Sequence, residues 1–135
     1  MSPAGAITES TMTPKKLTTL FVVDAIEPCL PAWEALGYAV TVRVPDEGPL
    51  GFAILKSKLG ELMLQTKKSL REDLPSVAKR KPSTLLYADV ASLAEAKKAL
   101  RGAEILVPRR KTFYGATEAW LALEGGVILG LAEVG

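Results

Sequence analysis

The stretch WLALEGGVILGLAEV, residues 120–134, decides the fold. Two apolar runs flank the glycine pair Gly125–Gly126, which predicts two antiparallel strands joined by a tight glycine turn. The second strand carries Gly130 in the middle of its apolar run. A glycine inside a strand packs no side chain and commonly marks a bulge or the close approach of another group. Gly130 therefore needs an explanation.

The order strand, helix and three strands occurs twice along the chain. Apolar and alternating runs predict strands of the first copy at 16–24, 39–44, 50–56 and 61–66, with a helix in 25–38. The second copy is predicted to have strands at 83–90 and 103–108, then the closing pair, with a helix at 91–102. Corresponding glycines are almost equally spaced, because 65 residues separate Gly37 from Gly102 and 66 separate Gly60 from Gly126. This spacing indicates an internal duplication of a βαβββ unit.

The domain organisation follows from this repeat. We expect a flexible tail at 1–15 and a single domain at 16–134, with modules at about 16–66 and 83–134 and a linker at about 67–82. Each module has one helix to cover one face of its strands, so the other face is expected to line a cleft. The predicted fold class is α+β, with curled mixed β-sheets around that cleft.

Composition excludes several kinds of chemistry. The 135 residues contain no histidine and one cysteine, Cys29. Histidine-based triads, histidine- or thiolate-ligated zinc and an intramolecular disulfide are therefore impossible. The absence of an apolar signal core in MSPAGAITESTMTPKK, and of any membrane-length apolar run, leads us to expect a cytoplasmic protein.

The charge of the chain gives no sign of a nucleic-acid or membrane partner. The net charge is only +2, and the basic runs Lys79–Lys81 and Arg109–Lys111 have no aromatic residues interleaved with them. We interpret these runs as solvated loops and as protection of an edge strand.

Four segments carry a resemblance to a known family: LFVVD (20–24), WEALGY (33–38), GELMLQ (60–65) and YGATEAWLALEGGVILGLAE (114–133). With the duplicated βαβββ pattern, the chain resembles the vicinal oxygen chelate superfamily, also called the glyoxalase/bleomycin resistance protein/dioxygenase family. The resemblance covers about residues 16–134. The turn LEGG (123–126) departs from the Asp-Pro-Asp-Gly of the family.

The resemblance also implies where a metal ion would bind. The corresponding positions are Leu17, Leu64, Leu85 and Gly130, which cannot coordinate a divalent cation. We therefore predict a metal-free member that uses no cofactor. Gly130 stands where metal-dependent relatives carry a glutamate; it either opens space on the cleft floor or marks a bulge or a close approach at a dimer contact.

Strand alternation assigns the cleft lining. The candidate ligand-binding residues are Phe21, Leu64, Leu85, Tyr87, Tyr114, Glu118, Trp120 and Gly130. Glu118 is the candidate catalytic residue, either as an acid–base group with a raised pKa or as a structural ion pair with Arg43 or a lysine. Trp120 is a ligand platform or a core or dimer contact, and Tyr114 guards the mouth or is a plain turn residue.

Three functions fit this pattern. The first is a metal-independent protein that captures a drug-like or aromatic metabolite, similar to the antibiotic-sequestering members of the family, with a ligand less cationic than bleomycin because the chain is not acidic. The second is a metal-free isomerase or lyase that uses Glu118 or Tyr87 for proton transfer. The third is an interaction module without a ligand. The resemblance further implies a homodimer, and short exposed sheet edges give a physical reason to pair.

Overall fold

The computed structural model describes residues 13–134, so most of the predicted tail at 1–15 lies outside the described residues. The elements are β1 (Lys16–Val23), η1 (Glu27–Cys29), α1 (Leu30–Ala35), β2 (Ala39–Val44), β3 (Phe52–Ser57), β4 (Gly60–Thr66), α2 (Lys67–Asp73), α3 (Pro75–Ala78), β5 (Thr84–Asp89), α4 (Leu93–Ala99), β6 (Glu104–Lys111), β7 (Ala116–Ala122) and β8 (Ile128–Val134). Between residues 13 and 134 no helix is long and apolar enough to cross a membrane.

The eight strands form one open, curled sheet in the order β2-β3-β4-β1-β5-β8-β7-β6. β1 pairs parallel with β4, and β5 pairs parallel with β8 in the same way. The predicted duplication is therefore visible in the topology. The two halves are continuous because β1 and β5 pair antiparallel at the centre, from Lys16 opposite Asp89 to Phe21 opposite Thr84.

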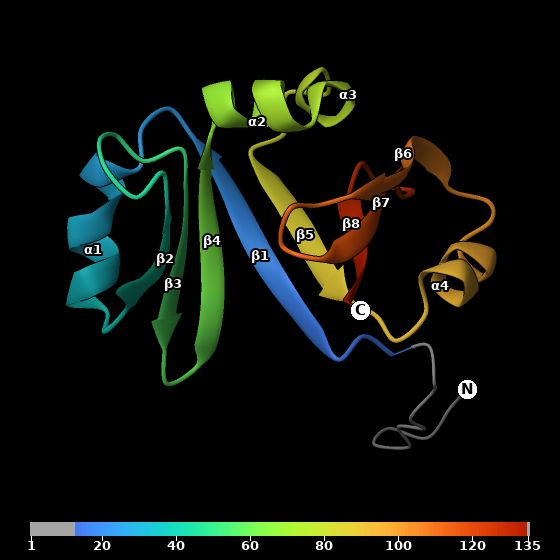
Figure 1. Cartoon of the computed structure of the whole chain (residues 1–135), viewed down its shortest axis with the longest axis horizontal. Helices are drawn as coiled ribbons and strands as arrows, with labels where there is room; N and C mark the ends of the chain where they lie inside the picture. The colour runs from blue at the N-terminus through green and yellow to red at the C-terminus, as the bar shows by residue number, and fades with distance from the viewer. Residues whose placement is uncertain (1–12, 135) are drawn as a thin grey trace.

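Helices cover both faces of the sheet (Figure 1). On the outer face, the segment η1–α1 packs on the first half and α4 packs on the second half. On the inner face, the linker helices α2 and α3 lie over the junction of the two halves and bury Leu70, Leu74 and Val77 against β1 and β5. Burial of each of these side chains contributes roughly 1.5–3 kcal/mol. The linker is thus part of the core.

The edge strand β6 is longer than expected from the sequence. The prediction ended it at Pro108, a residue that cannot donate to a strand ladder. The structure accommodates Pro108 at a register shift between Val107 and Arg110, and pairing with β7 resumes at Arg110 opposite Glu118. This extension places a cation directly across from the candidate catalytic carboxylate.

Candidate functional site

A cleft of about 1160 Å³ lies on the inner face of the sheet. Its walls come from β2, β3 and β4 on one side and from the β6–β7 hairpin on the other, and α2 contributes the residues between them. Apolar and aromatic side chains make up much of the lining: Leu20, Val42, Val44, Leu50, Phe52, Ile54, Met63, Tyr87, Phe113, Tyr114 and Trp120. This composition is typical of a pocket for an organic ligand.

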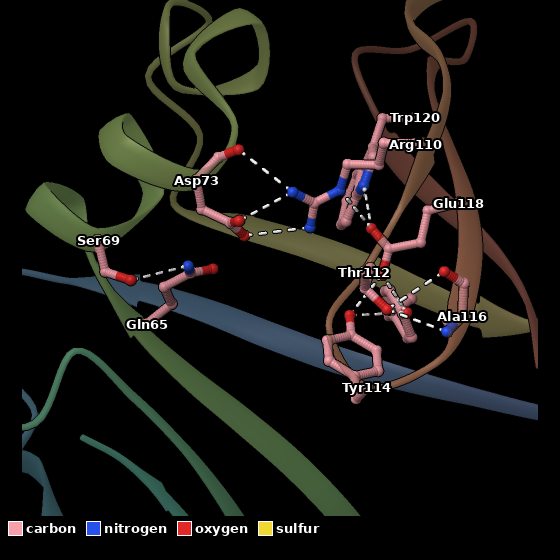
Figure 2. Close-up of polar contacts among 10 residues, drawn as sticks. Gln65, Ser69, Asp73, Arg110, Thr112, Tyr114, Ala116, Glu118 and Trp120 are labelled. Carbon is pink, nitrogen blue, oxygen red and sulfur yellow. Dashed lines mark hydrogen bonds and ion pairs between the residues drawn. The ribbon is translucent and has the colours of Figure 1, made fainter.

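Glu118 lies in the wall of this cleft and is fully buried. Its Oε1 accepts hydrogen bonds from Trp120 Nε1 (3.0 Å) and Arg110 Nε (2.9 Å). Its Oε2 accepts from the hydroxyl of Tyr114 (2.5 Å) and from that of Tyr87. Figure 2 shows Arg110, Tyr114 and Trp120 converging on the carboxylate. Four donors therefore satisfy one buried charge.

Arg110 connects this cluster to the linker helix. Besides Glu118, its guanidinium donates to Asp73 Oδ1 (2.8 Å), Asp73 Oδ2 (3.2 Å) and the Asp73 carbonyl oxygen (3.2 Å). Asp73 is the last residue of α2, so the side chain spans from β6 to the helix over the cleft (Figure 2). This bidentate pair ties α2 to the second half of the sheet.

The hydrogen bonds determine the protonation state of the cluster. Burial alone would raise the pKa of Glu118, but donation from Tyr114, Tyr87, Trp120 and Arg110 outweighs it and holds that pKa below its usual value. Burial and donation to Glu118 raise the pKa of Tyr114 to about 12, and the same causes raise the pKa of Tyr87 well above its usual range. A raised pKa, one of the two alternatives for Glu118, is therefore wrong, because the effect of its hydrogen-bond donors outweighs its desolvation. The other alternative, a structural ion pair, fits, but the partner is Arg110 and not Arg43 or a lysine. Arg43 instead donates to the carbonyl oxygens of Pro45 and Gly48.

Gly130 is explained by Trp120. The two residues are directly opposite on β8 and β7, and a Cβ on Gly130 would lie 2.7 Å from Cη2 and Cζ2 of the indole. The space left by the missing side chain is occupied by the ring. The expectation of an open cleft floor at Gly130 is therefore wrong, and the unbroken register of β7 and β8 excludes a bulge. The close approach at this glycine is that of the Trp120 ring within the chain.

The structure contradicts the cleft placement of three further residues. Phe21 and Leu64 point to the outer face, where Phe21 stacks on Trp33 at 5.8 Å between ring centroids. Leu85 does face inward, but it is buried in the cluster beneath α2 and α3. The strand alternation was misleading because helices cover both faces, so both faces of β1 and β4 are apolar and the register is ambiguous by one residue.

The inner-face register does not supply a set of side chains that could surround a metal ion. On β1 and β4 the residues that line the cleft are Leu20, Met63 and Gln65, and on β5 and β8 the inward residues include Tyr87 and, opposite it, Gly130. No group of three or more acidic, histidine or cysteine side chains among residues 13–134 could hold an ion. The side chains at these positions therefore do not fit the metal that the resemblance implies.

Several residues of the site were missed from the sequence. Arg110 was assigned to a solvated basic run, although a hairpin closed around TFYG would have placed it opposite Glu118. Phe113, 91% exposed beside Tyr114 at the hairpin tip, and Gln65, which donates to Ser69 Oγ (3.0 Å), carry no sequence signal of their own. Tyr87, Tyr114, Glu118 and Trp120 do lie together in the lining.

The chain is similar to known proteins in its three-dimensional structure. No protein-family sequence model and no curated protein matches the chain. Methylmalonyl-CoA epimerase from Mycobacterium tuberculosis matches with a TM-score of 0.68 and 18% identity, covering 95% of this chain and 93% of the epimerase. A glyoxalase/bleomycin resistance protein/dioxygenase superfamily member from Vibrio splendidus matches with a TM-score of 0.66 and 14% identity, covering 87% and 97%. A hypothetical protein from Bacillus halodurans gives a TM-score of 0.66 at 20% identity, covering 89% and 94%. The chain thus has the fold of the glyoxalase/bleomycin resistance protein/dioxygenase superfamily, also called the vicinal oxygen chelate superfamily.

Proposed function

We propose that this protein binds a small aromatic or amphipathic molecule in the inner-face cleft, without a metal ion and without chemical conversion. The observation that carries the proposal is the combination of a large apolar cleft with a buried carboxylate whose hydrogen-bonding capacity is already filled by the protein. A drug-like metabolite is the ligand class that such walls favour.

The walls supply both contact area and orientation. Phe52 and Ile54 on β3 and Met63 on β4 offer an apolar surface, and Phe113 and Tyr114 present aromatic rings at the mouth. Tyr114 is 55% exposed, so its ring is accessible although its hydroxyl is engaged by Glu118. Aromatic rings stack on a planar ligand at little conformational cost.

The same cluster argues for capture over catalysis. A general base works best when its pKa lies near the working pH. Glu118 has a lowered pKa and accepts four hydrogen bonds, so it is a weak proton acceptor. Tyr87 and Tyr114 hold their protons more tightly than free tyrosine does, so they are weak acids.

A native mass spectrum of the protein as purified, without added metal or chelator, tests the proposal first. We expect the folded protein to carry the additional mass of an organic ligand. If the protein is purified without a ligand, we expect the fluorescence of 1-anilinonaphthalene-8-sulfonate to increase when this probe is titrated with the protein. Phe113→Ala should weaken the binding of that probe several-fold, because it removes an aromatic contact at the mouth of the cleft. Leu59→Ala is the matched control, because Leu59 is equally exposed (93%) and does not line the cleft. Stoichiometric divalent metal, or a probe affinity equal in both variants, contradicts the proposal.

A metal-free isomerase or lyase in the same cleft is the second candidate, and the epimerase among the structural neighbours favours it. In this case Glu118 or Tyr87 would transfer the proton despite their shifted pKa values. Turnover of a candidate substrate that disappears in both Glu118→Gln and Tyr87→Phe, with ligand affinity retained, would replace capture with catalysis.

We further propose that the protein acts as a homodimer in the cytoplasm. The strands β2 and β6 end the sheet, and the outer side of an edge strand carries backbone N–H and C=O groups with which a strand of a second copy can pair. Sedimentation equilibrium tests this, and a monomer at micromolar concentration contradicts it.

A further inference from the structure

A second, smaller hollow lies on the other side of α2. It encloses about 320 Å³, and its floor is formed by Val22, Leu70, Ala78 and Pro82. No residue that lines it also lines the cleft. It is therefore a separate feature of the molecule.

The helix α2 separates the two hollows. Lys68, Ser69, Glu72 and Asp73 line the cleft, whereas Lys67, Leu70 and Arg71 line the second hollow. This division follows the helical repeat, since residues three and four apart share a face. The acidic side chains of α2 lie on the cleft side, and the second hollow receives only cations and Leu70 from this helix.

The rim of the second hollow is cationic. Lys67, Arg71 and Lys81 surround the apolar floor, and no carboxylate is among its lining residues. Lys67 pairs with Asp24 at 2.9 Å, while Arg71 and Lys81 form no ion pair with any residue in 13–134. The linker 67–82 contains six lysines or arginines and two acids, a net charge of +4, although the whole chain carries only +2.

Lys81 occupies an unusual backbone conformation. Its φ of 51° lies in the left-handed region, and among residues 13–134 no other non-glycine residue has a positive φ. The residue lies two positions beyond Lys79, the C-cap of α3, and its amide donates to the Ala78 carbonyl oxygen (2.9 Å). Glycine is the residue that adopts such a left-handed backbone most readily. A lysine here costs backbone energy and adds a cation at the rim of the hollow.

We propose that this hollow is a binding site for a small organic anion, with a phosphate or carboxylate group held by Arg71 and Lys81 and an apolar part placed on the floor of Leu70, Ala78 and Pro82. A guanidinium and an ammonium are the donors that recognise such groups through charge-assisted hydrogen bonds. The site is independent of the ligand proposed for the cleft.

Isothermal titration with phenyl phosphate and with inorganic phosphate, at low ionic strength, tests the site. We expect phenyl phosphate to bind more tightly than inorganic phosphate, because only the former contacts the apolar floor. Arg71→Gln should weaken the binding of phenyl phosphate roughly tenfold, which is the loss expected for one charge-assisted hydrogen bond. Lys79→Gln is the matched control, since it removes one charge from the same linker but not from the hollow. The affinity of this variant for phenyl phosphate should stay within about twofold of that of the unmodified protein.

Lys81→Gly provides a test that does not depend on a folding defect. Glycine suits the left-handed backbone, so the melting temperature should be unchanged or higher while phenyl phosphate affinity falls. Equal weakening by Arg71→Gln and Lys79→Gln would show general charge attraction and overturn the site. No phenyl phosphate binding, binding no tighter than that of inorganic phosphate, or full affinity in Lys81→Gly would overturn it as well.

Discussion

Gly130 lies directly opposite Trp120 on the paired strands β8 and β7, and the indole ring occupies the space where a Cβ on Gly130 would stand. The ring is 2% exposed and its Nε1 donates to Glu118. A glycine in one strand therefore allows a buried aromatic residue in the next, and the aromatic residue in turn supports the carboxylate of the site.

Gly130→Ala should destabilise the protein by about 1–3 kcal/mol, because the added methyl group would overlap a ring that is fixed by burial and by a hydrogen bond. Urea denaturation followed by tryptophan fluorescence measures the change. Gly102→Ala is the matched control, since a Cβ there meets no atom within 4 Å and its φ is not left-handed. Equal stability of the two variants would show that the ring has room to shift.

Glu118→Gln should lower the free energy of unfolding by about 2–3 kcal/mol at pH 7. The amide removes the charge that Arg110 faces and replaces one acceptor oxygen with a donor among four donors. Arg110 keeps Asp73 as a partner, which limits the loss. Glu124→Gln, on the exposed β7–β8 turn, is the control and should change stability by less than about 0.5 kcal/mol.

The pH dependence of stability should report the same carboxylate. The folded pKa of Glu118 is lowered, so its contribution is fully present above the unfolded pKa of about 4.3 and is lost as the pH falls toward the folded pKa. Between pH 5 and pH 2 the unmodified protein should therefore lose more stability than Glu118→Gln does. Parallel stability curves for the two proteins over this range would mean that Glu118 has an ordinary pKa.

The tyrosines of the cluster should ionise late. Tyr114 has a pKa raised to about 12 and Tyr87 ionises above its usual range, so absorbance at 295 nm should show incomplete tyrosinate formation at pH 11 while the protein remains folded. Glu118→Gln removes the negative charge beside both hydroxyls and should move part of this absorbance change to lower pH. Identical titration curves for the two proteins would show that the ionisation of the tyrosines does not depend on the charge of Glu118.

Asp73→Asn should loosen α2. The pair with Arg110 is partly exposed, so the global stability should fall by only about 0.5–1 kcal/mol. Hydrogen exchange of the α2 amides should nevertheless accelerate, because the last residue of the helix loses its tether to β6. Glu72→Gln, a neighbouring exposed carboxylate for which residues 13–134 supply no ion pair, should leave this exchange rate unchanged.

The fold was predictable because its signals are local. Strand and helix periodicity, the helix-ending glycine Gly37 and the paired spacing of the two halves appear in the sequence and recur in the topology. On β7, the alternation of side chains placed Glu118 and Trp120 on one face and Ala119 and Leu121 on the other. The assignment was possible because only one of these two faces carries a charged side chain, that of Glu118. Where both faces are apolar, as on β1, alternation misplaced Phe21.

The sequence by itself determined a duplicated βαβββ domain without metal-ligating residues at the positions implied by the family resemblance, because residue type and spacing are local properties. Only the tertiary structure decided the state of Glu118, since its four donors come from β5, β6, β7 and the hairpin loop and no local rule brings them together. It likewise decided the role of Gly130, whose missing Cβ has meaning only with Trp120 across the ladder. Charge, burial and pKa are properties of the assembled environment, and they become definite when distant segments pack.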